Sequence, residues 1–241
     1  MTLADILVSL FPKGHDVTNT DGVVLGAGTL SDGARATVIG IADRIPLGVD
    51  EAIRLSAHVL RSVETGDEGP ILVLIDSDSQ RMSKRDELLG LTEYLAHLAK
   101  CLIHADLRGR HTVGLLYGHT AAGAFIATAL ATRTLVALPG GDPAVMDLPS
   151  MAKVTKLSLE VLEEKAKSTP VFAPGLDNLA QTGAVVAVWD ERASLADQLQ
   201  ALLAAAEPAG DQRDRLGKTR EGRLKAAGIA ERVHDLALQH E

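Results

Sequence analysis

The chain has 241 residues, a length that fits one α/β domain or two smaller domains. Hydrophobic residues make up 46% and charged residues 23%, which is ordinary globular usage and excludes disordered, collagenous and coiled-coil classes. The net charge of -8 and the aromatic content of only 2% argue against nucleic-acid binding, because phosphates attract basic surfaces and unpaired bases stack on aromatic rings.

The cysteine count and the apolar runs bear on the compartment. Cys101 is the only cysteine, so an internal disulfide and a cysteine-built zinc site are both excluded. The start of the chain carries an acid and lacks the basic segment of a secretory signal. No uninterrupted apolar run approaches the roughly 18 residues that a membrane span needs. We therefore expect a cytoplasmic protein that does not bind membranes.

The first third of the chain alternates between strand-like and helix-like segments. Two β-like runs, 23–30 and 35–41, flank the turn residues Ser31-Asp32-Gly33, which predicts an opening hairpin. Apolar residues recur at helical spacing over 49–63 and predict a helix there. Residues 71–75 form a continuous apolar run, which is typical of a strand buried on both faces of a parallel sheet.

The rest of the chain continues this alternation. The patterns predict a polar loop at 76–79, a helix at 84–105, a strand at 112–117, a helix at 121–131, a strand at 134–138, a turn at 139–143, a helix at 150–167 interrupted near Leu157, a strand at 184–189 and a helix at 194–206. Such spacing indicates βαβ units. We expect one α/β domain over 1–210 and a charged helical appendage over 211–241. The basic run Arg213–Lys225 fits a solvated helix face, or a contact with an acidic carrier protein or CoA phosphates.

The segment Tyr117-Gly-His-Thr-Ala-Ala-Gly-Ala124 joins the end of a predicted buried strand to the start of a helix. Ligands of open parallel sheets bind at such strand ends. Glycine inside a helix costs about 0.8–1 kcal/mol relative to alanine, so Gly123 needs a reason to be there. Either the small residues uncover main-chain N–H groups for a substrate oxygen, or they allow the helix to pack closely on the sheet.

Two other catalytic motifs do not fit this segment. A hydrolase nucleophile elbow needs Gly-x-Ser-x-Gly, whereas Gly118-His-Thr-Ala-Ala122 has threonine at the nucleophile position and ends on alanine. A phosphate-binding P-loop needs Gly-Lys-Ser/Thr after four spacer residues, and the chain has no such motif. The sequence therefore disfavours hydrolase and nucleotidase functions.

Three stretches resemble the gamma subunit of biotin-independent malonate decarboxylases: Val38-Ile-Gly-Ile-Ala-Asp43, Pro46-Leu-Gly-Val-Asp-Glu-Ala52 and Gly118-His-Thr-Ala-Ala-Gly-Ala-Phe-Ile-Ala127. That subunit is similar to the C-terminal half of acyl-CoA carboxyltransferases, and the resemblance covers about 21–188. It implies a crotonase-like (ClpP/crotonase) ββα superhelix of the α/β class.

The resemblance also implies a site. In carboxyltransferases the matching turn supplies two main-chain N–H groups to an oxyanion hole, and by position these are the amides of Gly123 and Ala124. The family's Asp-x-Pro-Gly-Phe segment corresponds to Asp76-Ser-Asp-Ser-Gln80, in which Pro-Gly-Phe is missing. This departure puts a biotin site in doubt, as suits an enzyme that uses no biotin.

The implied reaction is the loss of CO2 from a malonyl thioester, which leaves an acetyl thioester. It passes through an enolate whose oxygen needs preorganised hydrogen-bond donors. The resemblance implies that the acyl group is carried by a CoA-derived prosthetic group on an acyl carrier protein. A beta subunit would share the site, and an alpha subunit, an acyl transferase, would complete the complex. We expect no metal and no biotin, and no cofactor bound directly to this chain.

Several side chains are candidates for this site. His119 is placed to donate to the carboxylate or to protonate the carbanion, although a lone histidine is often only a cap. The expected substrate contacts are Tyr117, Thr120, Ala122, Ser77, Ser79 and Gln80. Turn formation is the simpler explanation for the polar residues after the 71–75 strand. Two other functions stay open: a scaffold that shapes the beta subunit's site without a catalytic group, and a thioester hydrolase with Thr120 as nucleophile.

Overall fold

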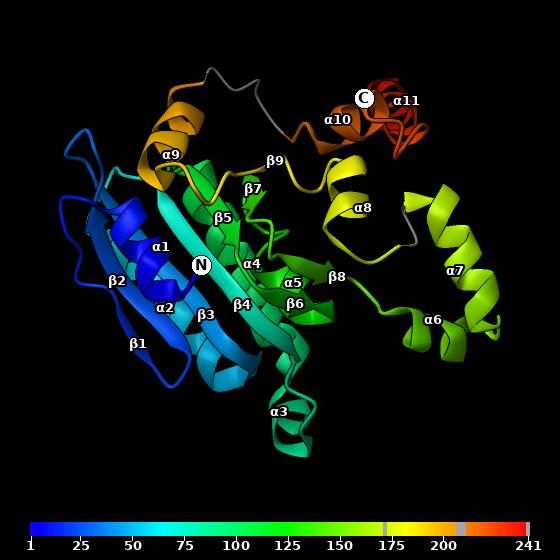
Figure 1. Cartoon of the computed structure of the whole chain (residues 1–241), viewed down its shortest axis with the longest axis horizontal. Coiled ribbons are helices and arrows are strands. Elements are labelled where there is room, and N and C mark those ends of the chain that lie inside the picture. Colours follow the sequence, from blue (N-terminus) through cyan, green and yellow to red (C-terminus); the bar gives the residue numbers. More distant parts are fainter. Residues whose placement is uncertain (171–172, 206–210, 240–241) are drawn as a thin grey trace.

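The computed structural model describes residues 1–170, 173–205 and 211–239. A seven-stranded sheet runs through it in the order β1-β2-β3-β4-β5-β7-β9 (Figure 1). The pairs within β1–β3 are antiparallel and the pairs from β3 to β9 are parallel. The strands are β1 (Thr18–Thr20), β2 (Val23–Thr29), β3 (Arg35–Leu47), β4 (Ile71–Gln80), β5 (Thr112–Leu116), β7 (Thr134–Ala137) and β9 (Ala187–Val188).

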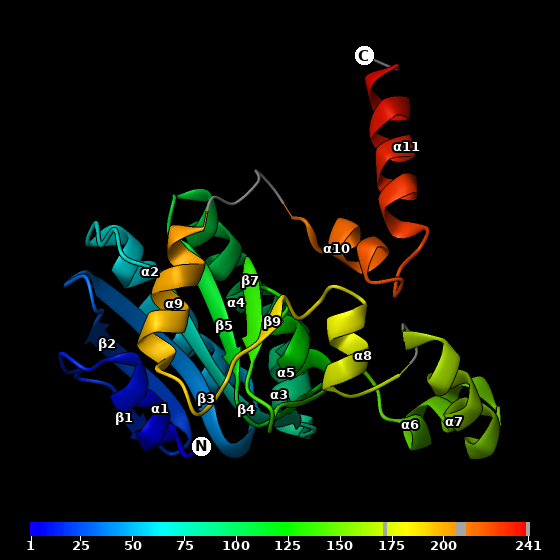
Figure 2. The same cartoon turned by 45° about the horizontal axis from the view of Figure 1, so that its top comes forward.

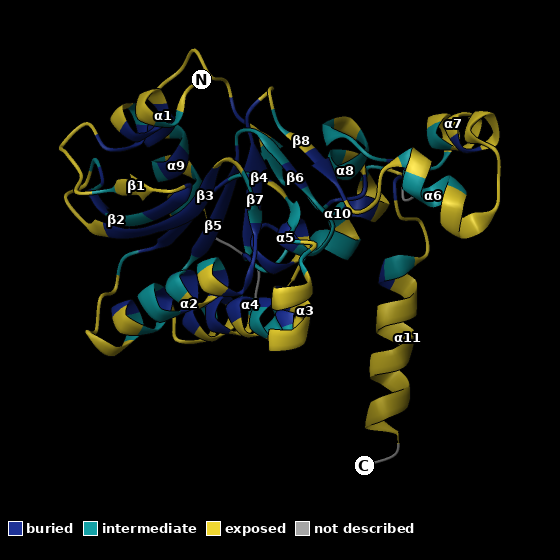
Figure 3. Ribbon diagram, turned by 90° about the horizontal axis from the view of Figure 1, so that it is seen from below, coloured by how far each residue is buried: buried dark blue, intermediate teal, exposed yellow. Residues whose placement is uncertain are grey.

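Helices cover both faces of the sheet. Helices α2 (Val49–Glu64) and α4 (Leu91–Leu107) lie on one face, and α1 (Leu3–Leu10) and α9 (Leu195–Ala204) lie on the other (Figure 3). The sequence of β4 does not alternate between apolar and polar residues because both faces of the strand are buried. Ile71, Val73 and Ile75 pack in the core on the α2 side, and Leu72 and Leu74 pack in the core on the α1 side. The predicted α/β class and the doubly buried strand are therefore confirmed.

Several predicted elements have different bounds in the structure, among them β3, which runs to Leu47 and not to residue 41, and β9, which covers only two residues of the predicted 184–189. The segment 76–79, predicted as a loop, continues β4, because Ser77 and Gln80 still pair with β3. The helix predicted over 84–105 is two helices, α3 (Lys84–Leu89) and α4, which meet at Gly90 with φ +86°. Helix α5 (Ala122–Ala127) ends earlier than predicted, and the first helix, α1, was not predicted at all.

Apart from β9 and α9, the described part of the C-terminal third is helical and lies to one side of the sheet (Figure 1). The predicted interruption near Leu157 is confirmed: helices α6 (Leu148–Thr155) and α7 (Leu159–Ser168) are separated at Lys156, which has φ +62°. Helices α8 (Leu176–Gln181) and α10 (Arg213–Thr219) follow, and α11 (Ala226–Leu238) projects from the body (Figure 2). Within the described residues, none of these helices or the others combines the length and apolarity that a bilayer crossing requires.

Candidate active site

The segment singled out in the sequence lies where strands β4 and β5 end. From β5 the chain enters the short strand β6 (His119–Ala121), which pairs in parallel with β8 (Asp142–Ala144), and then turns into α5 (Figure 1). The Ser77 Oγ of β4 and the Thr120 Oγ1 of β6 are 2.8 Å apart, and both side chains are buried. This pair fastens the turn to the end of β4.

A second contact with β4 fixes the start of β6. The Asp76 Oδ1 accepts a hydrogen bond from the His119 N–H at 3.0 Å. A Cβ atom on Gly118 would overlap the Asp76 carboxylate, so the glycine before His119 is required for this close approach. Asp76 therefore sets the position of the His119 backbone.

The imidazole of His119 is oriented by a carboxylate that the sequence analysis did not single out. His119 Nδ1 lies 2.8 Å from Asp142 Oδ2, and the side chains are 19% and 68% exposed, respectively. The contact follows from the pairing of β6 with β8, in which His119 and Asp142 are register partners. With Nδ1 bound to the carboxylate, Nε2 is the ring nitrogen left for a substrate. Asp142 belongs to the predicted Pro-Gly-Gly-Asp-Pro turn, where an acid reads first as a turn former.

The turn into α5 carries backbone strain. Ala122 has φ +49°, a left-handed conformation that L-residues other than Asn and Asp seldom adopt. Strained backbone of this kind persists only where surrounding contacts impose it, and it clusters at functional sites. The next residue, Gly123, donates its N–H to the Gln80 Oε1 at 2.9 Å.

These contacts correct the expectation of two uncovered amides. The Gly123 N–H is covered by the Gln80 side chain of the same chain. Ala124 is fully buried and packs in the core on the α2 side, so its main chain faces protein atoms and not an open crevice. The glycine of the turn thus allows close packing: a Cβ on Gly123 would lie 3.1 Å from Leu95 Cδ1 of α4.

The structure does not bring all candidate substrate contacts together. Tyr117 packs against the core on the α1 side, whereas Ala124 packs on the α2 side. The hydroxyl of Tyr117 is buried and has no hydrogen-bond partner in the described structure. Burial, followed by the nearby Asp76 and Asp43 carboxylates, raises the pKa of Tyr117 well above its usual range, so this side chain stays a neutral phenol.

The hydroxyl groups near the turn are engaged within the chain. Thr120 is fully buried against Ser77, which leaves no access for an acyl group to its hydroxyl. Ser79, which lies in β4 and not in the turn that its sequence suggested, donates its Oγ–H to the Gln80 carbonyl oxygen at 3.2 Å. A hydrolase with Thr120 as nucleophile is therefore disfavoured, because the nucleophile must reach both the substrate and a base.

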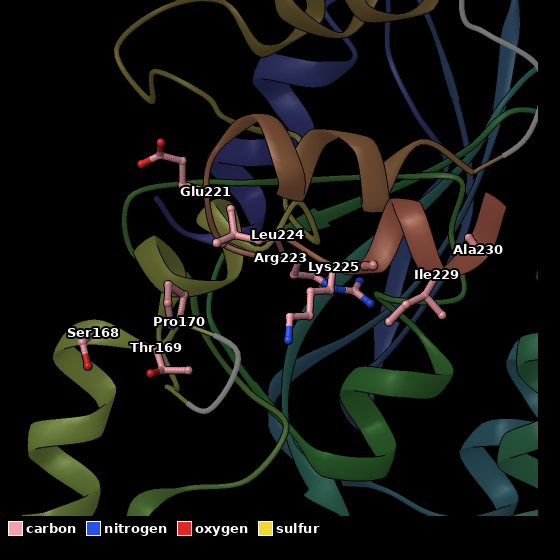
Figure 4. Close-up of a pocket in the computed structure, with 11 residues that line it drawn as sticks. Ser168, Thr169, Pro170, Glu221, Arg223, Leu224, Lys225, Ile229 and Ala230 are labelled. Carbon is pink, nitrogen blue, oxygen red and sulfur yellow. The ribbon is translucent and has the colours of Figure 1, made fainter. Parts of the chain in front are cut away.

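A separate cavity of about 640 Å³ lies between the end of α7 and the start of α11 (Figure 4). Its walls include Pro170 and Ile229, and none of the candidate site residues lines it. In the described part of the chain, no three His, Cys, Asp or Glu side chains lie close enough together to hold a metal ion.

The basic run before this cavity has a structural role that the sequence did not reveal. Arg213 donates to the Leu130 carbonyl oxygen and pairs with Asp211. Arg220 donates to the carbonyl oxygens of Ala180, Val185 and Val186. These two arginines therefore fasten α10 to the α/β core and are not simply part of a solvated helix face.

A family model and a curated protein both match this sequence. The model of the malonate decarboxylase gamma subunit family matches residues 42–237. A curated relative, the malonyl-S-ACP:biotin-protein carboxyltransferase MADD of Malonomonas rubra, is 29% identical over 154 residues, which is 60% of this chain and 53% of that protein. The chain thus spans about half the length of that relative.

Solved structures share the fold. A Pseudomonas malonate decarboxylase hetero-tetramer in complex with coenzyme A aligns over 98% of both chains with a TM-score of 0.76 and 24% identity. The Pseudomonas MdcD-MdcE hetero-dimer aligns over 98% of this chain and 99% of its own, with a TM-score of 0.74 and 23% identity. The transcarboxylase 12S core aligns over 87% of this chain and 42% of its own, with a TM-score of 0.66 and 14% identity. The expected crotonase-like carboxyltransferase fold is confirmed.

Proposed function

Because the chain belongs to the malonate decarboxylase gamma subunit family, we propose that it is the gamma subunit of a malonate decarboxylase. Together with a beta subunit it removes CO2 from a malonyl thioester and leaves the acetyl thioester. The single observation that carries this function is the family match over 42–237, which includes the whole strained turn at Ala122.

The proposed complex includes further partners. The malonyl group is carried by a CoA-derived prosthetic group on an acyl carrier protein, and an alpha subunit acts as acyl transferase. The printed name of the Malonomonas rubra relative, which specifies malonyl-S-ACP, supports a carrier-bound substrate. Neither biotin nor a metal takes part on this chain. The complex works in the cytoplasm, where the lone thiol of Cys101, buried in this chain, stays reduced.

In the proposed reaction the bond between the methylene carbon and the carboxylate carbon breaks, and CO2 leaves. The bonding pair forms an enolate, whose oxygen takes the negative charge, and a proton added at the methylene carbon gives the acetyl thioester. Preorganised N–H groups stabilise such an oxygen, and losing one donor costs about 2.7–4 kcal/mol of barrier. We assign the enolate oxygen to donors of the beta subunit, the departing carboxylate to the Gly123 N–H of this chain, and the proton to His119 Nε2.

The other roles in this proposal follow from the contacts. Ala122 holds the turn so that the Gly123 N–H points to the end of β4. The Ser77–Thr120 pair supports the turn from beneath, and Ser79 and Gln80 border the place where the acyl group binds. Tyr117 and Ala124 support the turn by packing in the core on its two sides, and neither contacts the acyl group in this proposal.

Reconstitution tests the proposed function. The chain alone, a beta subunit alone and their mixture are assayed for CO2 release from malonyl-carrier protein. We expect turnover only in the mixture, and a His119→Gln chain that still assembles should lower it about 100-fold, as for loss of a general acid. Activity of the chain alone would favour the hydrolase. If substitutions at position 119 and in the turn left the activity of the mixture unchanged, the chain would be a scaffold without a catalytic group.

A further inference from the structure

The Gln80 side chain covers a main-chain donor of the turn at the end of β4, the Gly123 N–H. Its Oε1 accepts from the Gly123 N–H at 2.9 Å, although the two residues are 43 positions apart in the sequence. Gln80 is the last residue of β4 and is half-buried, so its side chain lies at the border of the core and not within it. The other end of the carboxamide has one weak contact, from Nε2 to the sulfur of the exposed Met82 at 3.7 Å.

The chemistry of the two acceptors decides which of them binds the Gly123 N–H. A carboxamide oxygen is a neutral acceptor, whereas a carboxylate or enolate oxygen is charged and forms hydrogen bonds roughly twice as strong. An anionic malonyl group therefore competes well for the Gly123 N–H. The neutral carbonyl of the acetyl product gains no such advantage, and Gln80 competes with it from a covalently tethered position.

We propose that Gln80 is a displaceable acceptor that makes the Gly123 N–H selective for anionic acyl groups. The malonyl group displaces the carboxamide, and after CO2 has left and the carbon is protonated, Gln80 returns to the amide and favours release of the acetyl thioester. This inference rests on the proposed function. It adds a residue that sets specificity between substrate and product.

The test compares substrate and product in the reconstituted complex. The variants are Gln80→Ala, which removes the competing acceptor, and Gln80→Glu, which ties a charged acceptor to the same N–H. Gln200→Ala, at a half-buried glutamine on α9 whose Nε2 donates to Asp32 Oδ2 at 3.2 Å, is the matched control. The measured quantities are the kcat/KM for malonyl-carrier and the inhibition constant of the acetyl-carrier product.

For Gln80→Ala we expect the acetyl product to inhibit more strongly by about three- to tenfold, the range expected for one neutral hydrogen bond. The kcat/KM for the malonyl substrate should rise, because the substrate no longer has to displace the carboxamide from the Gly123 N–H. Gln80→Glu should lower that kcat/KM at least tenfold, since a tethered carboxylate both occupies the N–H and repels the substrate charge. Gln200→Ala should change neither quantity.

Two results would overturn the proposal. If Gln80→Ala weakened malonyl and acetyl groups equally, Gln80 would be an ordinary substrate ligand or a structural cap. If the acetyl inhibition constant did not change, Gln80 would not compete for the amide. Hydrogen exchange at the Gly123 amide of the full chain, expected to be faster in Gln80→Ala, shows independently whether the contact exists in solution. If the wild-type mixture releases no CO2, the proposed function fails while the exchange result still stands.

Discussion

Two aspartates hold the proposed proton donor, His119, in position. His119 is anchored through its N–H by Asp76 and through its ring by Asp142, so both the backbone and the imidazole have a fixed orientation. Partners that orient a reactive histidine matter nearly as much as the histidine itself. Asp142 is therefore a positioning residue, because its carboxylate contacts the ring and not the acyl group.

Replacing that carboxylate gives a graded prediction. Asp142→Asn should lower kcat about tenfold in the reconstituted complex with little change in KM, because the ring loses its preferred orientation but keeps its place. Asp142→Glu should recover part of the loss. Asp197→Asn, at an exposed aspartate on α9, is the control and should be neutral. An equal loss in kcat and in thermal stability for Asp142→Asn would assign a purely structural role.

The strain at Ala122 leads to a prediction on stability. A left-handed alanine costs about 1–2 kcal/mol, and glycine removes that cost while loosening the unfolded chain by a smaller amount. Ala122→Gly should therefore raise the free energy of unfolding by about 0.5–1 kcal/mol, measured by urea denaturation. Ala121→Gly, at a neighbour with φ -141°, should lower it. A loss of stability for both variants would mean that Ala122 is not strained.

Sequence reasoning found most residues of the site but not their contacts. Gly123 and Gln80 were both candidates, yet no pattern along the chain relates a β4 end to a turn 43 positions later. The misassigned loop at 76–79 hid the contact, because only a strand that continues to Gln80 brings its side chain beside α5. Asp142 was missed because an aspartate in a predicted turn is explained by turn formation alone. Nothing in the sequence indicates that its carboxylate also orients a histidine.

At the scale of elements, the sheet was predictable and the breaks between helices were less so. The apolar run of β4 and the small-residue turn are strong local signals, and both lie where predicted. Helix α4 was overextended because its leucines keep the right period across Gly90, whose left-handed backbone ends α3. The bounds of β4 depend on pairing with β3, which is a tertiary effect.

One buried carboxylate joins two helix starts and makes stability depend on pH. Asp86 Oδ1 accepts from the Val49 N–H of α2 at 2.8 Å, and the Ser83 hydroxyl donates to the other oxygen. The Ser83 hydrogen bond, the Val49 hydrogen bond, and the charges of Arg81 and Arg85 hold the pKa of Asp86 below its ordinary value of 3.8. Because the pKa of Asp86 is lower in the folded state than in the unfolded state, its ionised carboxylate stabilises the fold at pH values above the ordinary pKa. This stabilisation is lost as the pH falls through the lowered pKa of the folded state.

Asp86→Ala should therefore lower the free energy of unfolding by about 2 kcal/mol at pH 7, the scale of a hydrogen bond to a charged group. The difference between the variant and the wild type should shrink as the pH falls below 3.8. Urea denaturation of both proteins across this range measures it. A difference that stays constant down to the lowest pH would show that the charge of Asp86 plays no part.

The division of the C-terminal appendage is also testable at this scale. The boundary at residue 211 stays a prediction, and the contacts of α10 bear on it: Arg213 and Arg220 bond this helix to the core, and Gly217 packs against Thr182. Helix α11 packs on α10, and its residues beyond Ala227 are exposed throughout the described range.

Removing 226–241 should therefore leave the melting temperature of the isolated chain within a few degrees of wild type, whereas removing 211–241 should lower it by several degrees more. Differential scanning calorimetry of both truncations measures the two midpoints. Equal midpoints would mean that α10 contributes as little as α11, and the boundary would then lie before Asp211.

In the molecule as a whole, the turn at Ala122 lies where β4 and β5 end. The core positions this turn through the contacts of Ser77 and Gln80 at the end of β4. The cavity of about 640 Å³ between α7 and α11 is lined by residues other than those of the turn. In the proposed function, a beta subunit completes the site at the turn.

Covalent capture tests most directly whether an acyl group reaches this turn. His119→Cys places a thiol at the turn, and the other thiol of the chain, Cys101, is buried. The variant, bound to the beta subunit, is mixed with carrier protein bearing a bromoacetyl group in place of malonyl, and the products are mapped by mass spectrometry. We predict alkylation at position 119, dependent on the beta subunit and suppressed by malonyl-carrier, with none in a Gln200→Cys control. Labelling at position 119 no faster than at position 200 would contradict the account.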